Sequence, residues 1–158
     1  MKVLALRRRP ELSGNDLAVD QMFDHAHLND LIAASDYIMV AAPLTPETRG
    51  MVGAAQIAAM KPNAVVINVG RGAVIDEAAL IDALENNRIK GAALDVFAVE
   101  PLPAGSPFYR LQNVLMSPHT ADHVQDFVQL AVECFLDNMQ RFQAGQPLQN
   151  LVDKRAGY

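Results

Sequence analysis

Little in this sequence of 158 residues points to a disulfide framework, a membrane or nucleic acid. Cys134 is the single cysteine, so no internal disulfide is possible, and a reducing cytoplasm is the expected location. No stretch approaches the roughly 20 apolar residues of a transmembrane helix. The opening MKVLALRRRP places its arginines after a short apolar run, unlike a signal peptide. The formal net charge of −5 argues against a general affinity for nucleic acid or acidic membranes.

The residues that are present form alternating apolar and amphipathic segments. With 51% hydrophobic and 20% charged residues, the composition suits one globular domain that has its own core. Helices are predicted where apolar residues recur at spacings of three and four, and strands where short apolar runs end at turn residues. The helices are predicted at 27–35, 54–60, 76–88 and 123–145, and the strands at 2–6, 17–23, 36–42, 63–69, 91–97 and 113–119.

Most of the predicted strands are apolar throughout, which is typical of parallel strands that are buried on both faces. Because they alternate with helices, we predict an α/β fold in which helices cover both faces of a parallel sheet. The last predicted helix has apolar residues at helical spacing, and we expect them to belong to the core: Val124, Phe127, Ala131, Phe135, Met139 and Phe142.

Side chains suited to proton transfer follow three of these strands. Arg71 stands between two glycines at the end of 63–69, Glu100 follows 91–97, and His119 ends 113–119. Because the carboxyl ends of parallel strands meet at one edge of a sheet, we expect these side chains to lie together. Histidine exchanges protons near neutral pH, a carboxylate can orient it, and arginine can bind a substrate carboxylate at two points.

Each of these residues also has a plainer interpretation. Arg71 could be a surface charge in a turn, His119 a partly buried histidine, and Asp95 the cap of a turn. His119 and His123 have the four-residue spacing of some metal sites. However, HTADH lacks the second-position glutamate of a metalloprotease and has no obvious third ligand, so no metal is predicted.

Four linked motifs resemble the nucleotide-binding domain of the D-isomer-specific 2-hydroxyacid dehydrogenases. They are PLTPETRGMV (43–52), VINVGRGAVIDEAAL (66–80), ALDVFAVEPLP (93–103) and NVLMSPHTA (113–121), and the tail GQPLQNLVD (145–153) is similar as well. The resemblance implies hydride transfer between a nicotinamide cofactor and a 2-oxo or 2-hydroxy acid, on glyoxylate- or hydroxypyruvate-like substrates. It also implies that residues 1–145 form a partial NAD(P)-binding domain and that 146–158 lead back to a substrate domain.

The resemblance assigns roles residue by residue. By position, Arg71 resembles the substrate-binding arginine, His119 the proton donor, and Glu100 the acid paired to that histidine. Asp95 resembles the aspartate that meets the nicotinamide amide. Pro43, Val69, Gly70 and Ala121 are also predicted to line the cofactor. Arg71 and His119 are expected to contact the cofactor as well as the substrate.

Three consecutive arginines bear on the choice of cofactor. In dinucleotide-binding folds an acid at the end of the second strand takes the ribose 2′-hydroxyl, whereas an arginine accommodates a 2′-phosphate. Here the strand 2–6 is followed by Arg7, Arg8 and Arg9, and no acid occurs before Glu11. The sequence therefore slightly favours NADP over NAD, with a solvated basic turn as the alternative.

The sequence contains no G-x-G-x-x-G, the loop that holds a dinucleotide pyrophosphate. By resemblance the chain corresponds to the back half of such an enzyme, starting at an internal methionine, and its Rossmann-like, doubly wound sheet is expected to lack the first strand. In the order 3-2-1-4-5-6 that strand is central, so its loss leaves 2–6 and 36–42 with open edges. The two halves could close up, another chain could fill the gap, or the first segment could be displaced. We expect a homodimer that shares strands or exchanges its C-terminal helix.

Two functions of different kinds remain open. The first is an oxidoreductase of the 2-hydroxyacid dehydrogenase type, whose isolated 158-residue chain is expected to be inactive or nearly so. The second is a non-catalytic remnant or a dimerisation and binding module, which the missing phosphate loop favours.

Overall fold

The structure is a computed structural model that describes residues 1–8 and 16–155. Its helices are α1 (Leu28–Ala34), α2 (Ala54–Ala58), α3 (Glu77–Glu85) and α4 (Phe127–Gln143). Its strands are β1 (Leu4–Leu6), β2 (Gln21–Phe23), β3 (Tyr37–Val40), β4 (Val65–Asn68), β5 (Gly91–Leu94) and β6 (Val114–Met116). The described residues also contain the short 3-10 helices η2 (His25–His27), η3 (Gly72–Val74) and η4 (Pro107–Arg110).

Every helix and strand expected from the sequence is present, with shorter bounds. The helix start expected at Asp76 is confirmed: its side chain accepts a hydrogen bond from the Ala79 amide at 3.1 Å and so caps α3. The 3-10 helices were not expected, because three or four residues are too short to show a helical periodicity.

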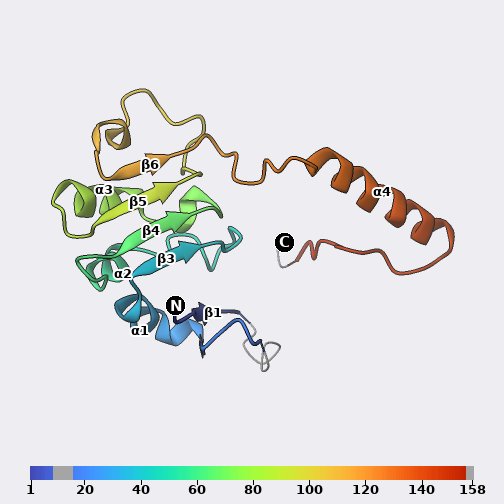
Figure 1. The fold of residues 1–158 in the computed structure, drawn as a ribbon, viewed down its shortest axis with the longest axis horizontal. Coiled ribbons are helices and arrows are strands. Elements are labelled where there is room, and N and C mark those ends of the chain that lie inside the picture. Colours follow the sequence, from blue (N-terminus) through green and yellow to red (C-terminus); the bar gives the residue numbers. More distant parts are fainter. Residues whose placement is uncertain (9–15, 156–158) are drawn as a thin grey trace.

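The strands form two separate parallel sheets (Figure 1). The larger sheet has the order β3-β4-β5-β6, and the smaller one pairs β1 with β2. In the larger sheet, parallel strands joined through helices confirm the predicted α/β class and match part of a Rossmann domain. The carboxyl ends of β4, β5 and β6 consequently share one edge, where the loops that carry the candidate site residues begin.

The open edges expected from the sequence are also present. Among the described residues, β1 pairs only with β2, and β3 pairs only with β4. The two sheets therefore do not close up on one another, which was one of the ways considered to fill the gap. The backbone groups on the free side of β3 have no strand partner in the described part of the chain.

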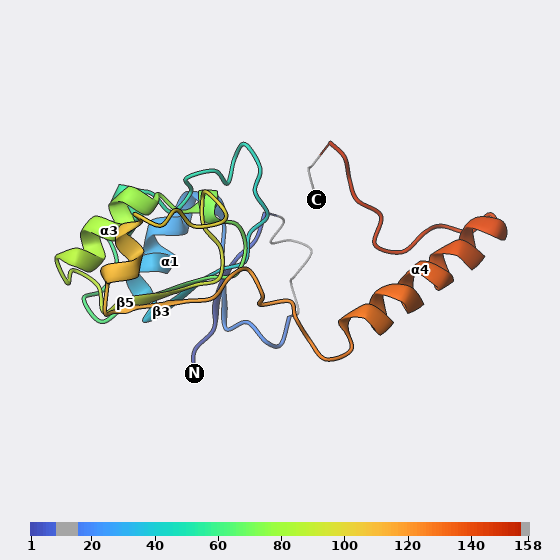
Figure 2. The same ribbon diagram turned by 90° about the horizontal axis from the view of Figure 1, so that it is seen from above.

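The hydrophobic core lies on one side of the larger sheet. Ile32 of α1, Ile57 of α2 and Leu84 of α3 are at most 5% exposed and pack in one cluster with Ile38 and Val66 of the sheet. Seen along the sheet, these three helices lie on the same side of it (Figure 2).

The expectation that helices cover both faces of the sheet is wrong. Side chains alternate along β3, so that Ile38 and Val40 are buried whereas Tyr37 and Met39 are each 64% exposed. Leu115 on β6 is likewise exposed. The apolar run 36–42 indicated burial on both faces, but no described element packs over the second face.

The assignment of the last helix to the core is also wrong. No residue of α4 is buried, and Phe127, Phe135, Met139 and Phe142 are all exposed. Figures 1 and 2 show α4 standing away from the sheets, beyond the carboxyl ends of the strands. Within the described residues, no helix is long and apolar enough to cross a membrane.

Candidate functional site

The loop that carries Arg71 is held by a buried polar residue of β4. Asn68 is 1% exposed; its side-chain amide donates to the Arg71 carbonyl at 3.2 Å, and its Oδ1 accepts from the Gly70 amide at 3.1 Å. One side chain therefore ties down both ends of the turn that presents the guanidinium. The signal for this residue was available in the sequence, because Asn68 interrupts an otherwise apolar strand.

The glycines on either side of Arg71 are explained by close backbone contacts. A Cβ atom on Gly72 would lie 1.9 Å from the carbonyl carbon of Phe97, and one on Gly70 would lie 2.8 Å from the Ala42 carbonyl oxygen. Both distances are far below van der Waals contact. The chain around Arg71 thus crosses the loops that follow β3 and β5, and only residues without a side chain fit there.

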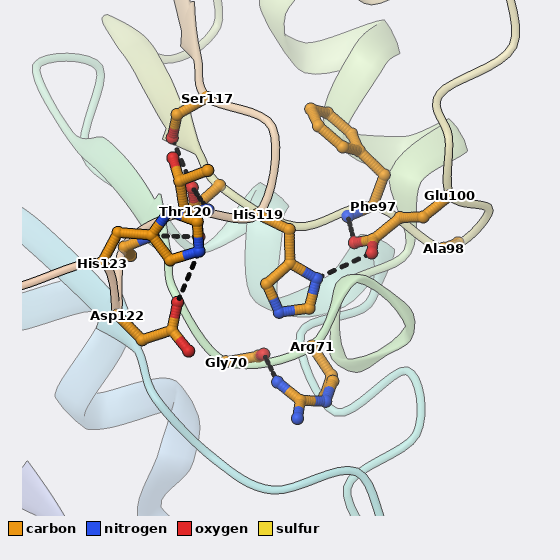
Figure 3. A network of polar contacts seen from close by, with 12 residues as sticks. Gly70, Arg71, Phe97, Ala98, Glu100, Ser117, His119, Thr120, Asp122 and His123 are labelled. Carbon is orange, nitrogen blue, oxygen red and sulfur yellow. Dashed lines mark hydrogen bonds and ion pairs between the residues drawn. The ribbon is translucent and has the colours of Figure 1, made fainter. Parts of the chain in front are cut away.

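His119 and Glu100 form a direct pair across the loops after β5 and β6. His119 Nδ1 lies 2.7 Å from Glu100 Oε2, and Glu100 Oε1 accepts from the Phe97 amide at 2.9 Å (Figure 3). The two side chains are partly exposed, at 42% and 36%. The carboxylate therefore fixes the orientation of the imidazole and leaves Nε2 facing outward from the pair.

The environment of Glu100 favours its ionised form. The hydrogen bond with His119 is the largest cause that lowers the pKa of Glu100 below its ordinary value of 4.5, followed by the Phe97 amide. Partial burial acts in the opposite direction, and the positive charge of Arg71 adds to the lowering. A negative charge is thus retained beside the imidazole.

Arg71 lies at the same edge of the sheet as this pair. Its Nη1 donates to the Gly70 carbonyl at 2.7 Å, and Figure 3 shows the guanidinium below the His119 ring. The electrostatic effect of Arg71 on Glu100 agrees with this placement. Because a guanidinium has five N–H donors, it can bind a carboxylate in addition to this backbone carbonyl.

Asp95 anchors the loop that carries His119. This residue is 4% exposed; its Oδ1 accepts from Ser117 Oγ at 2.5 Å and from the Thr120 amide at 2.9 Å, and its Oδ2 accepts from the Ala121 amide at 3.0 Å. Burial by itself raises the pKa of Asp95, but these hydrogen bonds outweigh it and lower the pKa below 3.8. The alternative role as a turn cap is therefore realised, and contact with a nicotinamide stays a prediction.

The backbone of His119 is held in an unusual conformation by the same anchor. Its φ is +54°, in the left-handed region that residues with a side chain seldom occupy. The His119 amide donates to the Asp95 carbonyl at 2.8 Å, so both the backbone and the carboxylate of Asp95 hold this turn. Strain of this kind is common at functional sites, where it presents a side chain in one direction.

The other positions predicted to line a cofactor lie at the same edge. Val69, Asp95 and Ala121 border a shallow pocket of about 110 Å³ beside Leu115. Pro43 is exposed in the loop after β3, where its carbonyl accepts from Thr48 Oγ1 at 2.6 Å. These residues form a largely apolar wall at this edge, and their contact with a nicotinamide stays a prediction. The described chain has no glycine-rich loop for the phosphates of a dinucleotide.

The arginines after β1 are placed only in part. Arg7 pairs with Asp16 at 2.5 Å. The pKa of Glu47 is lowered mainly by a hydrogen bond with Thr45, with a smaller contribution from the charge of Arg8, which places Arg8 near the loop after β3. Arg9 lies outside the described residues. Arg7 follows the carboxyl end of β1, and its contact with a 2′-phosphate stays a prediction.

In the described ranges, no three His, Cys, Asp or Glu side chains are gathered as metal ligands. The side chain of His123 is exposed, with its Nε2 atom 4.0 Å from Oδ1 of Asp122, and it lies away from the His119–Glu100 pair. Besides Asn68, the sequence did not identify Phe97 and Ser117, whose contributions come from a backbone amide and a hydroxyl. Neither contribution leaves a signal in the sequence, because any residue can supply the amide and serine is common in loops.

The fold and these motifs define a nucleotide-binding domain of a 2-hydroxyacid dehydrogenase, and comparison with protein families agrees. Residues 1–121 match the family "D-isomer specific 2-hydroxyacid dehydrogenase, NAD binding domain". The chain belongs to this family.

The similar proteins include curated glyoxylate/hydroxypyruvate reductases. The chain is 43% identical over 129 residues to glyoxylate/hydroxypyruvate reductase B of Pectobacterium carotovorum, covering 82% of this chain and 40% of that protein. It is 39% identical over 155 residues to the protein of the same name from Yersinia pestis, covering 97% and 46%. The chain thus spans less than half the length of these curated relatives.

Two solved structures have the same fold. One is the NADPH-dependent glyoxylate/hydroxypyruvate reductase of Sinorhizobium meliloti in complex with NADP and sulfate, with a TM-score of 0.87, 33% identity, and coverage of 100% of this chain and 50% of that one. The other is a D-isomer specific 2-hydroxyacid dehydrogenase of Xanthobacter autotrophicus in complex with NADPH and MES, with a TM-score of 0.83, 37% identity, and coverage of 100% and 73%.

Proposed function

We propose that this chain carries the substrate-binding and proton-transfer half of an NAD(P)-dependent reductase of small 2-oxo acids such as glyoxylate or hydroxypyruvate. The observation that supports the proposal most directly is the 2.7 Å contact between His119 and Glu100, at the sheet edge where Arg71 also lies. The proposal assigns one small substrate to these three side chains, which come from distant parts of the sequence.

In the proposed reaction, each side chain has a distinct task. Arg71 binds the substrate carboxylate at two points and orients the 2-oxo group toward His119. The imidazolium of His119 donates the proton that the carbonyl oxygen gains on reduction, and Glu100 stabilises the charged ring before the transfer. The reduced nicotinamide cofactor, when bound, supplies the hydride. Val69 and Ala121 would line its nicotinamide end.

NADP is the proposed cofactor, with NAD as the alternative. Arg7 stands at the carboxyl end of β1, where a basic group can meet a 2′-phosphate. Two solved relatives carry NADP or NADPH, which supports the preference by analogy. The cytoplasmic location expected from the single cysteine is part of the same proposal.

The described chain has no cradle for the cofactor phosphates, so we expect little or no turnover from it alone. The test monitors loss of NADPH or NADH absorbance with glyoxylate or hydroxypyruvate. The purified chain is compared with a chimera in which this chain replaces the matching part of the Pectobacterium reductase. We expect activity in the chimera and its loss, by 100-fold or more, in the chimera with His119→Gln. Normal turnover by the isolated chain contradicts the expected need for completion, and an inactive but folded chimera contradicts the catalytic assignment.

A second candidate function is a binding or assembly module that performs no chemistry. The free edges of β1 and β3 and the uncovered face of the larger sheet favour it, because such surfaces promote association. Fluorescence titration separates the two candidates: a chimera that binds neither NADH nor NADPH supports the module.

A further inference from the structure

The loop that carries Glu100 is tied to helix α3 by a second carboxylate. Glu77 Oε1 accepts a hydrogen bond from the Ala98 amide at 2.6 Å, across 21 positions of the chain. Glu77 is the first residue of α3, but the helix is already capped by Asp76, whose side chain accepts from the Ala79 amide. Glu77 therefore holds the loop after β5 and is not the cap of its own helix.

Two consecutive amides of this loop donate to two different carboxylates. The Phe97 amide donates to Glu100 Oε1 at 2.9 Å, and the Ala98 amide donates to Glu77 (Figure 3 shows the loop). The Phe97 carbonyl carbon lies against Gly72, where no Cβ atom would fit. The peptide that joins Phe97 to Ala98 is thus held between Gly72 and Glu77. Through Phe97, this peptide also fixes the direction of the amide that Glu100 accepts.

Glu77 stands on the same segment of the chain as Arg71. The turn of η3 connects the two residues, and its Val74 amide donates to the Arg71 carbonyl at 3.1 Å. Val74 is 0% exposed, so this connection is packed into the core. The hydrogen bond from the Ala98 amide to Glu77 consequently joins the loop of Glu100 to the element that carries Arg71.

We propose that Glu77 is a positioning residue of the candidate site. By holding the Ala98 amide, it keeps the loop of Glu100 at the distance from Arg71 that suits one small 2-oxo acid. The inference rests on the proposed function, in which Arg71 binds the substrate carboxylate and His119 gives a proton to the adjacent carbonyl oxygen. Misplacing such groups by about 1 Å can slow a reaction about 100-fold. In a plainer role, the Glu77 charge would only favour the N-terminus of α3.

Three variants separate the hydrogen bond from the charge. Glu77→Ala removes the acceptor, and Glu77→Gln keeps an oxygen acceptor but removes the charge. Glu77→Ala combined with Ala78→Glu keeps a carboxylate in the first turn of α3, but turns it by about 100° around the helix and away from the Ala98 amide. We expect all three to fold, because Ala98 is exposed to water and Asp76 still caps the helix. If Glu77→Ala unfolds, Glu77→Asp replaces it, since its side chain is one methylene shorter.

Steady-state kinetics of the chimera that contains this chain measure the effect on the reaction. We expect kcat to fall about 10- to 100-fold in Glu77→Ala and in the double variant, and to stay within about threefold in Glu77→Gln. KM for glyoxylate should change by less than about threefold in all three variants, because Asn68 holds the turn of Arg71 independently.

A titration of the chain itself gives a second measurement, which does not require activity. Carbon-detected NMR should place the midpoint of Glu100 higher in Glu77→Ala and in the double variant than in the natural sequence. The reason is that His119 and the Phe97 amide, which lower the pKa of Glu100, are then less well aligned with it. Loss of a negative charge alone acts in the opposite direction, so Glu77→Gln should leave the midpoint unchanged or slightly lower.

The outcomes distinguish this inference from the proposed function. If the double variant behaves like the natural sequence, the charge is sufficient and the positioning role is overturned. Unchanged kcat in Glu77→Ala, in a chimera that His119→Gln inactivates, also overturns it and leaves the proposed function standing. A folded but inactive chimera contradicts the proposed function. The midpoint of Glu100 then decides the positioning role by itself, and an unchanged midpoint in Glu77→Ala overturns it.

Discussion

His119 Nδ1 lies 2.7 Å from Glu100 Oε2, although 19 positions separate the two residues in the chain. The contact depends on two loops that leave neighbouring parallel strands, β5 and β6, at the same edge. The hydrogen bonds to Asp95 on one side and from the Phe97 amide on the other hold both partners in register.

The pair predicts how the Glu100 carboxyl titrates. Because hydrogen bonding to His119 is the largest cause of its lowered pKa, carbon-detected NMR should place the titration midpoint of Glu100 below 4.5. His119→Asn, chosen because asparagine tolerates a positive φ, should raise this midpoint toward the ordinary value. A folded pKa below the unfolded one stabilises the protein above pH 4.5, and this contribution is lost as the pH falls through the lowered value. An unchanged midpoint in His119→Asn would mean that the contact does not exist in solution.

Asp95→Asn should loosen the loop that presents His119. The substitution replaces a buried carboxylate that accepts three hydrogen bonds, and we expect a loss of about 2–4 kcal/mol in the free energy of unfolding at pH 7, measured by urea denaturation. Because the pKa of Asp95 is lowered, the difference between the two proteins should shrink as the pH falls below 3.8.

Asp122→Asn is the matched control for this measurement. The side chain of Asp122 is exposed, and its Oδ1 atom lies 4.0 Å from Nε2 of His123, which is too far for a hydrogen bond. Its replacement should therefore change the free energy of unfolding by less than about 0.5 kcal/mol. Equal effects of the two substitutions would contradict the anchoring role of Asp95.

Gly72→Ala should severely destabilise the domain. The added methyl group would overlap the backbone of Phe97, which cannot move without displacing the loop of Glu100, and we expect a loss of at least about 3 kcal/mol. Gly105→Ala provides the comparison, because no atom lies within 4 Å of the added Cβ and the melting temperature should stay within a few degrees. A tolerated Gly72→Ala would show that the loops after β4 and β5 do not cross as described.

Arg71→Lys should separate substrate binding from proton transfer in the active chimera. Lysine keeps the charge but loses the fork geometry, so KM for the 2-oxo acid should rise about 10- to 100-fold, the loss of one good charge-assisted bond. Steady-state kinetics with Arg110→Lys, at an exposed arginine of η4, serves as the reference. If Arg71→Lys leaves KM unchanged, the arginine does not bind the substrate.

The α/β class and the position of nearly every element follow from the sequence, because runs such as 63–69 and 91–97 carry a strong local signal. The sequence also singled out Arg71, Glu100 and His119, because their strands end where a parallel sheet collects its loops. Their mutual distances, the crossing at Gly72 and the anchor at Asp95 depend on which loops meet in space. No local pattern encodes that.

The burial of apolar side chains likewise depended partly on the sequence and partly on the tertiary structure. An apolar residue shows that a surface avoids water, but not which partner covers it. The sequence therefore marked Met39, Leu115 and several residues of α4 as apolar, and only the tertiary structure decided that these surfaces are exposed within one chain. The helices α1, α2 and α3 pack on a single face of the sheet, and the loop fixed by Asp95 carries α4 away from the other.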